Sequence, residues 1–325
     1  MGTQVICLGA VNVDLRYRVP DLRPFLEKWP DLRRGGEMAL GPGEETGLQD
    51  LLRRHAEPAG RQGGGQAANT AWALARMGLE AALVGRVGAD ADGAFLRESL
   101  AGVNLDYLMQ AGESGRAYIL MDEAGERTIL VAPNTNDALA LPDVPLEALA
   151  QSKFLHFTAF AGEGPLAVQK EIARRLQDGP RLTLDPGELY ARRGLAVLED
   201  IIDHLDTLLV TAREWELLGG PEKMHPHWAP PVVVIKRGAL GARLLTPPRY
   251  LDFPVELFSR PVDTLGAGDV FAAGYLAGRV SGLHLNLAVR LANRAAAVSL
   301  GGAGRENYPD AKFLEQQLFQ LTQLV

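Results

Sequence analysis

The chain has 325 residues, of which 47% are hydrophobic and 22% are charged, a composition typical of a globular protein with a large buried core. Its formal net charge is −7 without a basic cluster, so binding to nucleic acid or to an anionic membrane is not expected. A single cysteine, Cys7, excludes an intramolecular disulfide and a cysteine-based zinc site. We identify no signal peptide and no apolar run long enough to span a membrane, and we expect a cytoplasmic protein.

The first 62 residues combine a strand, a stretch broken by prolines and a helix. Val5–Leu8 is a short apolar run that predicts a buried strand. Five prolines fall between residues 16 and 62, and proline cannot donate to a sheet ladder, so this stretch is not expected to supply a central strand. Within it, Glu44–His55 carries leucines at helical spacing and predicts an inserted helix.

The next segment predicts further strands and helices together with one hairpin. The glycine-rich loop 63–69 precedes a helix that is expected to end at Gly78, and Ala81–Val87 predicts another strand. Residues 116–121 and Arg127–Ala132 flank an Asp-Glu-Ala-Gly-Glu turn, which is typical of a β-hairpin.

From residue 154 onward, strands alternate regularly with helices. Such alternation predicts crossover connections and a mainly parallel sheet with helices on its faces. The predicted strands are 154–157, 182–184, 207–210 and 232–235, with an antiparallel pair at 243–245 and 250–253. The predicted helices are 165–176, 195–204, 212–218, 269–279, 285–300 and 311–324.

The most specific stretch is the run Asp-Thr-Leu-Gly-Ala-Gly-Asp at 263–269, directly before an apolar helix. Gly266 and Gly268 permit backbone conformations closed to other residues, so successive N–H groups at the helix start can bind an anion. Asp269 lies in the first turn of that helix, where a carboxylate can accept the proton of a hydroxyl that attacks a phosphate. An isolated Gly-x-Gly-Asp is more often only a tight turn with a capping aspartate.

The whole run 263–274 resembles the C-terminal signature of the ribokinase-like (PfkB) carbohydrate kinases. The resemblance implies an ATP-dependent phosphotransferase with an alcohol group as acceptor, in which Asp269 is the general base. It implies that the backbone amides of Gly266, Ala267 and Gly268 form the anion hole. The implied fold is α/β, with three layers around a mainly parallel sheet and with a small β-sheet lid.

Two further segments resemble the acceptor-binding parts of that family. The glycine-rich loop is similar to its N-terminal signature, which implies that Gly64, Gly65 and Asn69 bind substrate hydroxyls. Asn12 and Asp14 follow the first strand and are assigned the same role, because a carboxylate with two oxygens suits a vicinal diol. Without the resemblance, the loop is equally well explained as a tight strand-to-helix connection, and the two polar residues as an Asx-turn.

ATP is expected to lie against the second half of the chain. Thr211 and Glu214 fall where the family carries Asn-x-x-Glu, and the resemblance implies that Glu214 helps to hold Mg²⁺ through water. Threonine in place of asparagine leaves the details of metal binding open, and both residues also fit a helix capping box. The other residues implied to bind the nucleotide are Lys236, Gly238, Gly241 and Asn293.

The resemblance also implies a monovalent-cation site, for K⁺, made mainly from backbone carbonyl groups. Its residues would be Asp263, Leu265, Ser299, Gly302 and Gly304. On the hairpin, Arg127 lies beside the turn and is expected to be an edge-strand charge that discourages aggregation. Arg116 is open to either that role or contact with a phosphate already present on the acceptor.

The chain is expected to divide into two discontinuous domains. The large domain is predicted to comprise residues 1–13, 41–103 and 134–325, and the lid residues 14–40 and 104–133. The region 16–62 and the hairpin are expected to form one mobile cover that keeps water from the transferred phosphate.

The acceptor is expected to be a hydroxylated small molecule. A sugar is the main prediction, and a nucleoside is the alternative because the insertion at 16–62 is somewhat similar to the adenosine-kinase branch. A ligand-binding protein of the same fold that has lost catalysis is an alternative of another class. Lid-to-lid homodimers occur in similar kinases, and the insertion could block or replace that contact.

Overall fold

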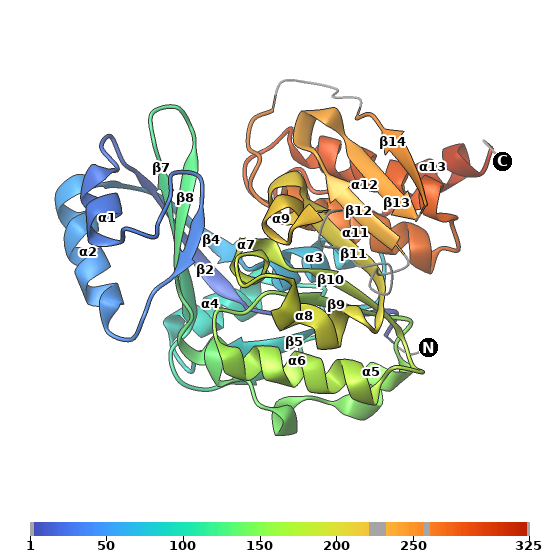
Figure 1. Ribbon diagram of the computed structural model, residues 1–325, viewed down its shortest axis with the longest axis horizontal. Helices are drawn as coiled ribbons and strands as arrows, with labels where there is room; N and C mark the ends of the chain where they lie inside the picture. The colour runs from blue at the N-terminus through green and yellow to red at the C-terminus, as the bar shows by residue number, and fades with distance from the viewer. Residues whose placement is uncertain (1–2, 221–231, 247, 256–260, 324–325) are drawn as a thin grey trace.

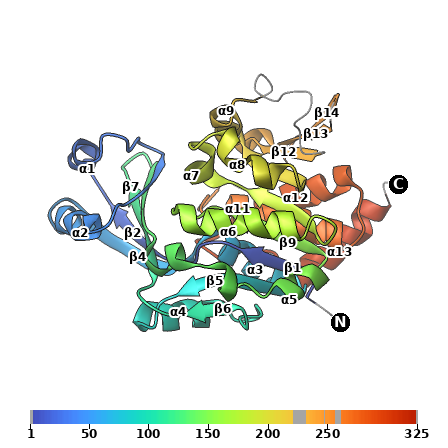
Figure 2. The same ribbon diagram turned by 60° about the horizontal axis from the view of Figure 1, so that its bottom comes forward.

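The computed structural model describes residues 3–220, 232–246, 248–255 and 261–323. These residues form a large sheet of nine strands and a small sheet of five (Figure 1). Helices lie on both faces of the large sheet, which confirms the three layers, and the small sheet stands to one side of them (Figure 2).

The large sheet is mainly parallel, as predicted. Its order is β14 (Arg249–Phe253), β13 (Ala242–Thr246), β12 (Val232–Lys236), β11 (Leu205–Thr211), β10 (Arg181–Asp185), β9 (Phe154–Thr158), β1 (Val5–Leu8), β5 (Ala81–Val87) and β6 (Leu108–Gln110). All neighbours from β12 to β6 pair in parallel. The hairpin β13–β14 extends the sheet antiparallel at one edge.

Two sets of helices cover the large sheet. One face carries α3 (Gln66–Arg76), α4 (Ala91–Ser99), α11 (Ala267–Val280), α12 (Leu285–Ser299) and α13 (Ala311–Thr322). The other face carries α5 (Leu146–Gln151), α6 (Glu163–Arg175), α7 (Gly187–Ala191), α8 (Leu195–Ile202) and α9 (Ala212–Leu217). Short 3-10 turns are η1 (Asn134–Ala138), η2 (Leu141–Asp143) and η3 (Gly238–Leu240).

The central strand β1 shows why both faces need helices. Val5 and Cys7 pack in the same core as α3 and α11, whereas Ile6 and Leu8 pack in the core of α6 and α8. Side chains of a strand alternate between the two faces of its sheet, so a fully apolar strand must be covered on both sides.

The small sheet contains the predicted hairpin. Its order is β3 (Glu37–Ala39), β8 (Arg127–Ala132), β7 (Gly115–Met121), β2 (Asn12–Arg18) and β4 (Glu57–Gly64). The hairpin strands β7 and β8 pair antiparallel, and β2 joins β7 in parallel and β4 antiparallel. Because β2 follows β1 almost directly, the two sheets are tied together at the carboxyl end of a central strand.

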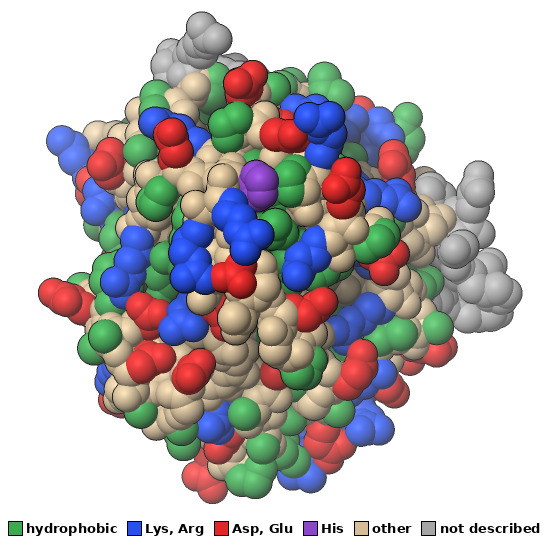
Figure 3. Space-filling model, turned by 90° about the vertical axis from the view of Figure 1, so that its left-hand side faces the viewer, with side chains coloured by type: hydrophobic (Ala, Val, Ile, Leu, Met, Phe, Trp, Pro, Cys, Tyr) green, Lys and Arg blue, Asp and Glu red, His purple; other side chains and the backbone are tan. Residues whose placement is uncertain are grey.

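Two helices, α1 (Arg23–Lys28) and α2 (Glu44–His55), cover the outer face of the small sheet, and we call the sheet and these helices the cap. Their shared core includes the buried side chains of Phe25, Leu48, Tyr118 and Leu130. Seen from its outer side, the cap carries charges of both signs mixed with scattered apolar side chains (Figure 3). The outer face of the small sheet is therefore buried under α1 and α2 of the same chain.

The cap includes residues that the predicted boundaries gave to the large domain. Helix α2 and strand β4 lie between residues 44 and 64 and belong to the cap, whereas β6 joins the large sheet. The apolar side of α2, with Leu48 and Leu52, is buried against the outer face of the small sheet. Strand β4 contains Pro58 and lies at a sheet edge, the position where a proline is tolerated.

We predict that Leu48→Ala loosens the cap as one unit. Replacing a buried leucine by alanine costs about 2–5 kcal/mol, and Leu48 is fully buried in a core shared by the 23–55 segment and the hairpin. Hydrogen exchange should therefore accelerate in both segments together and stay unchanged in β9–β12. Leu198→Ala, in the core beneath α8, is the control and should affect the large domain instead. Faster exchange in α2 alone would contradict a shared core.

Candidate active site

Two cavities meet at the start of helix α11. The first has a volume of about 230 Å³ and lies between the carboxyl ends of the large-sheet strands and the small sheet. The second has a volume of about 630 Å³ and is bounded by α9, η3, α11 and α12. Gly268 lines both cavities, so a group in one can reach a group in the other at this point.

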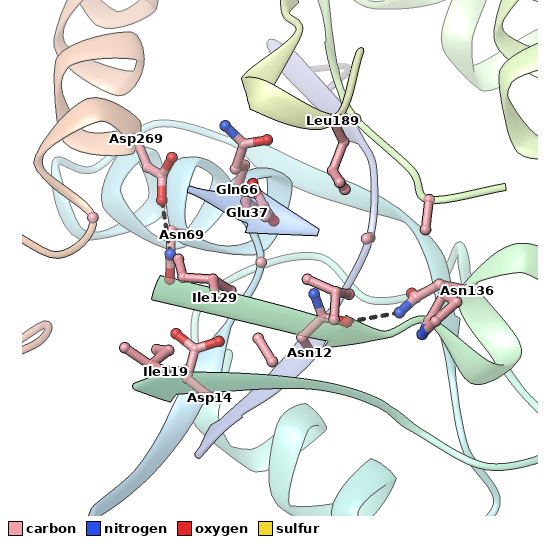
Figure 4. Close-up of a pocket in the computed structure, with 18 of the residues that line it drawn as sticks. Asn12, Asp14, Glu37, Gln66, Asn69, Ile119, Ile129, Asn136, Leu189 and Asp269 are labelled. Carbon is pink, nitrogen blue, oxygen red and sulfur yellow. Dashed lines mark hydrogen bonds between the residues drawn. The ribbon is translucent and has the colours of Figure 1, made fainter. Parts of the chain in front are cut away.

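Asp269 lines the first cavity from the first turn of α11. Its carboxylate is buried, with 8% of the residue exposed, and Oδ2 accepts a hydrogen bond of 2.7 Å from Nδ2 of Asn69 (Figure 4). Burial raises the pKa of Asp269 to about 7, in spite of that hydrogen bond. A carboxyl group that titrates near neutral pH is well suited to act as a general base.

The amide of Asn69 is oriented by Arg305, a residue that the sequence analysis did not identify. Nε and Nη2 of Arg305 donate to Oδ1 of Asn69 at 3.0 and 2.9 Å. A guanidinium group can only donate, so the amide oxygen must face it and the amide nitrogen is left for Asp269. Arg305 therefore positions the carboxylate through Asn69.

The predicted acceptor residues lie together in the first cavity (Figure 4). Asn12 and Asp14 reach it from β2, and Gly65 and Asn69 from the start of α3. Burial raises the pKa of Asp14 to about 6. Gly64 does not line the cavity, and its role is steric: a Cβ at that position would lie 2.1 Å from Oδ1 of Asp14.

Three polar side chains of this cavity were not among the predicted site residues. Glu37 comes from β3, Gln66 from α3 and Asn136 from η1, whose Nδ2 donates to Oδ1 of Asn12 at 2.9 Å. The pKa of Glu37 is raised to about 7, mainly by burial and to a smaller extent by repulsion from Glu188 and other carboxylates. Gln66 lies inside the glycine-rich loop, whereas no motif surrounds Glu37 and Asn136, which reach the cavity through the contact of the two sheets.

The predicted anion hole has the expected backbone form. Gly266 has a φ of 76°, in the left-handed region, and precedes the first residues of α11, Ala267 and Gly268. The first N–H groups of a helix have no partner within it and attract an anion. Nζ of Lys236 lies 3.6 Å from the position that a Cβ of Gly268 would take, so a positive charge faces the same place.

The ends of three strands of the large sheet place Thr211 and Lys236 on the lining of the second cavity and Asp185 behind that lining. Thr211 caps α9 and its N–H donates to Oε2 of Glu214 at 2.7 Å, which forms the predicted capping box. Lys236, at the end of β12, pairs with Asp185 at the end of β10. Oδ1 of Asp185 is buried and has no hydrogen-bond partner among the described residues. Asp185 was missed, although ligands are expected at the carboxyl ends of parallel strands.

The other predicted nucleotide residues also line the second cavity. Gly238 and Gly241 flank η3, and Asn293 reaches the cavity from α12. Nδ2 of Asn293 donates to the backbone oxygen of Phe253 at 2.9 Å, so its amide is already engaged by the chain. Glu214 itself lines neither cavity and lies behind Thr211 and Lys236.

The predicted cation-site residues are held by the protein's own donors. Asp263 accepts hydrogen bonds from the N–H groups of Leu265 and Gly304, and Ser299 donates to the backbone oxygen of Ala296. The side chain of Arg127 is 22% exposed and pairs with Asp263, so its prediction as a free edge-strand charge is wrong.

The other hairpin arginine, Arg116, pairs with Glu45 and Asp92 and does not line the first cavity. Within the described part of the chain, no cluster of three or more histidine, cysteine or carboxylate side chains could hold a metal ion by itself. Among the same residues, no helix has the length and apolar character needed to cross a bilayer.

The amino-acid sequence is similar to those of proteins described as sugar kinases. An uncharacterized sugar kinase of Archaeoglobus fulgidus is 32% identical over 246 residues, which cover 73% of this chain and 98% of that protein. An ATP-dependent ribose-1-phosphate kinase of Halopiger xanaduensis is 30% identical over 261 residues, with coverage of 77% and 84%.

A solved structure with the same fold is adenosine kinase from Sinorhizobium meliloti. It superposes with a TM-score of 0.84 and 22% identity and covers 98% of this chain and all of the other. The family model described as pfkB family carbohydrate kinase matches residues 50–311, which is most of the chain and contains both cavities' glycine-rich loops. With this match and with the first relative above 30% identity, the chain belongs to the pfkB family of carbohydrate kinases.

Proposed function

We propose that the protein transfers the γ-phosphate of ATP to a hydroxyl group of a small sugar or sugar-like acceptor. The observation that carries the proposal is the position of Asp269, a buried carboxyl with a pKa of about 7, where the two cavities meet at Gly268. The acceptor occupies the first cavity and ATP the second. The buried carboxyl of Asp269 beside the start of α11 supports catalysis over a binding protein without it.

In this mechanism the oxygen of the acceptor hydroxyl attacks the γ-phosphorus of ATP in line, while Asp269 accepts the proton of that hydroxyl. The N–H groups of Gly266, Ala267 and Gly268, with Lys236, stabilise the charge of the transferring phosphate. Proton transfer of this kind contributes typically about 10²–10⁴-fold to the rate. Orientation of the acceptor by the buried polar side chains of the first cavity adds to it.

Mg²⁺ is expected to bind together with ATP, and the chemistry of the charged groups fits it. The unpartnered oxygen of Asp185 and the carboxylate of Glu214 are hard donors, and Mg²⁺ commonly keeps several waters and binds through only one or two carboxylates. The metal neutralises phosphate charge when bound. A monovalent cation near Asp263 stays a prediction.

The first cavity favours a small acceptor without negative charge. Its volume of about 230 Å³ is below the range of roughly 300–1,000 Å³ for drug-sized ligands. Asp14, Glu37 and Asp269 line it, and its lining includes no lysine, arginine or histidine among the described residues. Carboxylates attract hydroxyl donors and repel phosphate, so an unphosphorylated sugar is favoured over a phosphosugar.

The cap is proposed to be the cover over the acceptor. Glu37, Ile119 and Ile129 of the small sheet line the first cavity, so the acceptor is shielded only when the cap lies against the large domain. On the opposite face of the same sheet, Tyr118 and Leu130 pack under α1 and α2. These helices occupy the surface through which another cap would pack, which favours a protein that does not dimerise through the sheet.

We predict that Asp269→Asn lowers kcat at least about 100-fold with the fold intact, because only the proton acceptor is lost. The measurement is ADP release with a panel of sugars, ribonucleosides and phosphosugars, with circular dichroism to check folding. In the unchanged protein, kcat/KM should fall as pH decreases below about 7, the pKa of Asp269, because protonation removes the base.

Asp203→Asn is the matched control, since Asp203 is exposed at the end of α8. It should leave kcat and the pH profile unchanged. An Asp269→Asn variant that retains turnover within about tenfold would show that another group takes the proton.

We predict that Asn69→Leu moves the acid limb of the kcat/KM profile to higher pH. The hydrogen bond from Asn69 lowers the pKa of Asp269, so its removal raises that pKa and a higher pH is needed to ionise the base. Arg305→Gln should shift the limb in the same direction, because it frees the amide of Asn69. An unchanged limb in both variants would mean that Asn69 only binds the acceptor.

We predict that Glu37→Gln weakens the preference for uncharged acceptors. Loss of a charged hydrogen-bond acceptor should raise KM for a neutral sugar about tenfold, since such bonds contribute about 1.5–3 kcal/mol. The same change should lower KM for the matching phosphosugar, because one repulsive charge is removed. Glu123→Gln, in the exposed hairpin turn, is the control. An equal change of KM for both acceptors would contradict a role in selectivity.

A further inference from the structure

The carboxylate of Asp263, at the start of the loop that leads to the proposed anion hole, accepts three hydrogen bonds and lies beside two guanidinium groups. Its Oδ1 accepts the N–H of Leu265 at 2.9 Å and pairs with the guanidinium of Arg127. Its Oδ2 accepts the N–H of Gly304 at 3.1 Å and lies 3.3 Å from Nη2 of Arg16. A carboxylate offers about four lone-pair positions, and three of them accept hydrogen bonds here. Nη2 of Arg16 donates its hydrogen bond to Oε1 of Gln62 at 2.7 Å and adds a positive charge beside Oδ2 of Asp263.

Both guanidinium groups come from the cap, whereas Asp263 belongs to the large domain. Arg16 lies on β2 and Arg127 on β8, with β7 between them in the small sheet. Arg127 also donates to Oγ1 of Thr264 at 3.0 Å. The side chain of Asp263 is 10% exposed and those of the arginines 18% and 22%, so water and salt screen these contacts less than ordinary surface pairs.

These surroundings do not fit a monovalent cation bound by Asp263. A cation would need free lone pairs on the carboxylate, whereas three hydrogen bonds are already made to it and each oxygen faces a guanidinium group. Two guanidinium charges beside the same group would repel it. Gly304, another predicted ligand, presents its N–H and not its carbonyl oxygen to Asp263.

We propose that Arg16 and Arg127 hold Asp263 in place of a monovalent cation, so that closure of the cap itself fixes the anion-hole loop and phosphoryl transfer needs no K⁺. The two arginines are positioning residues, because they act on Gly266–Gly268 through Asp263. The inference rests on the proposed function for its kinetic consequences. Because the contact joins two separate parts of the molecule, the loop is ordered when the cap is closed and loses two partners when it opens.

The first test is the cation dependence of the unchanged protein. Activity is measured in KCl, in NaCl and in a tetramethylammonium salt at constant ionic strength. We expect kcat to agree within about twofold in all three, because no alkali cation contacts Asp263. Activation of several fold by K⁺ over tetramethylammonium would overturn the proposal.

The second test removes the guanidinium charges. Arg127→Gln should lower kcat about 10–100-fold, the size of effect expected when a catalytic group is displaced slightly, with little change in KM for ATP or acceptor. Arg127→Lys should recover part of the loss, because it restores the charge without the second hydrogen bond. Arg16→Gln combined with Arg127→Gln frees the carboxylate and should make the activity respond to K⁺.

Arg53→Gln is the matched control, since Arg53 is an exposed arginine of the cap whose one ion-pair partner within the described ranges is Asp50 of its own helix. It should keep the kcat and the cation independence of the unchanged protein. A kcat for Arg127→Gln equal to that of this control would also overturn the proposal.

A readout without turnover separates this inference from the proposed function. In the ligand-free protein, Arg127→Gln should speed hydrogen exchange of the segment 263–268 and of Gly304, and Arg53→Gln should not. Added K⁺ should not slow exchange in the unchanged protein. If exchange follows this pattern but no hydroxylated acceptor is phosphorylated, the ordering of the loop by Arg16 and Arg127 is supported and the proposed function fails. If phosphorylation is observed but exchange is the same in both variants, only the role of the two arginines fails.

Discussion

The structure depends on keeping several carboxylates together in a site that must also receive the phosphates of ATP. Asp14, Glu37, Asp185, Glu214 and Asp269 lie near one another, and the pKa values of most of them are raised by burial. Buried like charges are costly unless cations or N–H groups compensate them. The compensating groups are Lys236 at the end of β12, Arg305 in the segment between α12 and α13, and the N–H groups in the first turn of α11. The negative charge that remains uncompensated can be stabilised by hydroxyl donors and by a bound divalent cation.

The same constraint explains why the site lies between two sheets. The large sheet supplies rigid strand ends, where Asp185, Thr211 and Lys236 are held by pairing on both sides of their strands. The small sheet has one side for the acceptor and one for its own helices, as the alternation of Ile119 with Tyr118 along β7 shows. A two-sided sheet of this kind can move as a unit without exposing its own core. The large sheet therefore holds the groups proposed to act on the phosphate, and the small sheet controls access of the acceptor to them.

The sequence predicted best what is encoded by neighbours along the chain. The boundaries of Glu44–His55 and Ala81–Val87 agree with the structure, and residues of the 263–269 run line the first cavity, as expected of the predicted base and anion hole. Contacts between distant residues were not predictable: Arg305 and Asn69 are 236 positions apart, and Arg127 and Asp263 are 136 positions apart. Such pairs leave no pattern in the neighbouring sequence, because an arginine that pairs with a distant residue cannot be told from a solvent-exposed arginine by its sequence neighbours. The domain boundary around α2 differed for the same reason, because its partner surface is formed by strands on either side of it in the sequence.

One feature of the acceptor site has an evolutionary consequence. Residue 64 has no side chain, and the carboxylate of Asp14 fills the space where one would be, with both oxygens within 2.2 Å of the missing Cβ. The two positions share a single volume, since Asn12–Arg18 pairs along Glu57–Gly64 in a fixed register. A larger residue at 64 is therefore compatible only with a smaller residue at 14, whereas a smaller residue at 14 is compatible with Gly64 as it stands. A lineage that gains a side chain at position 64 must shorten residue 14 first or at the same time, and relatives with a side chain at 64 should carry a small residue at 14.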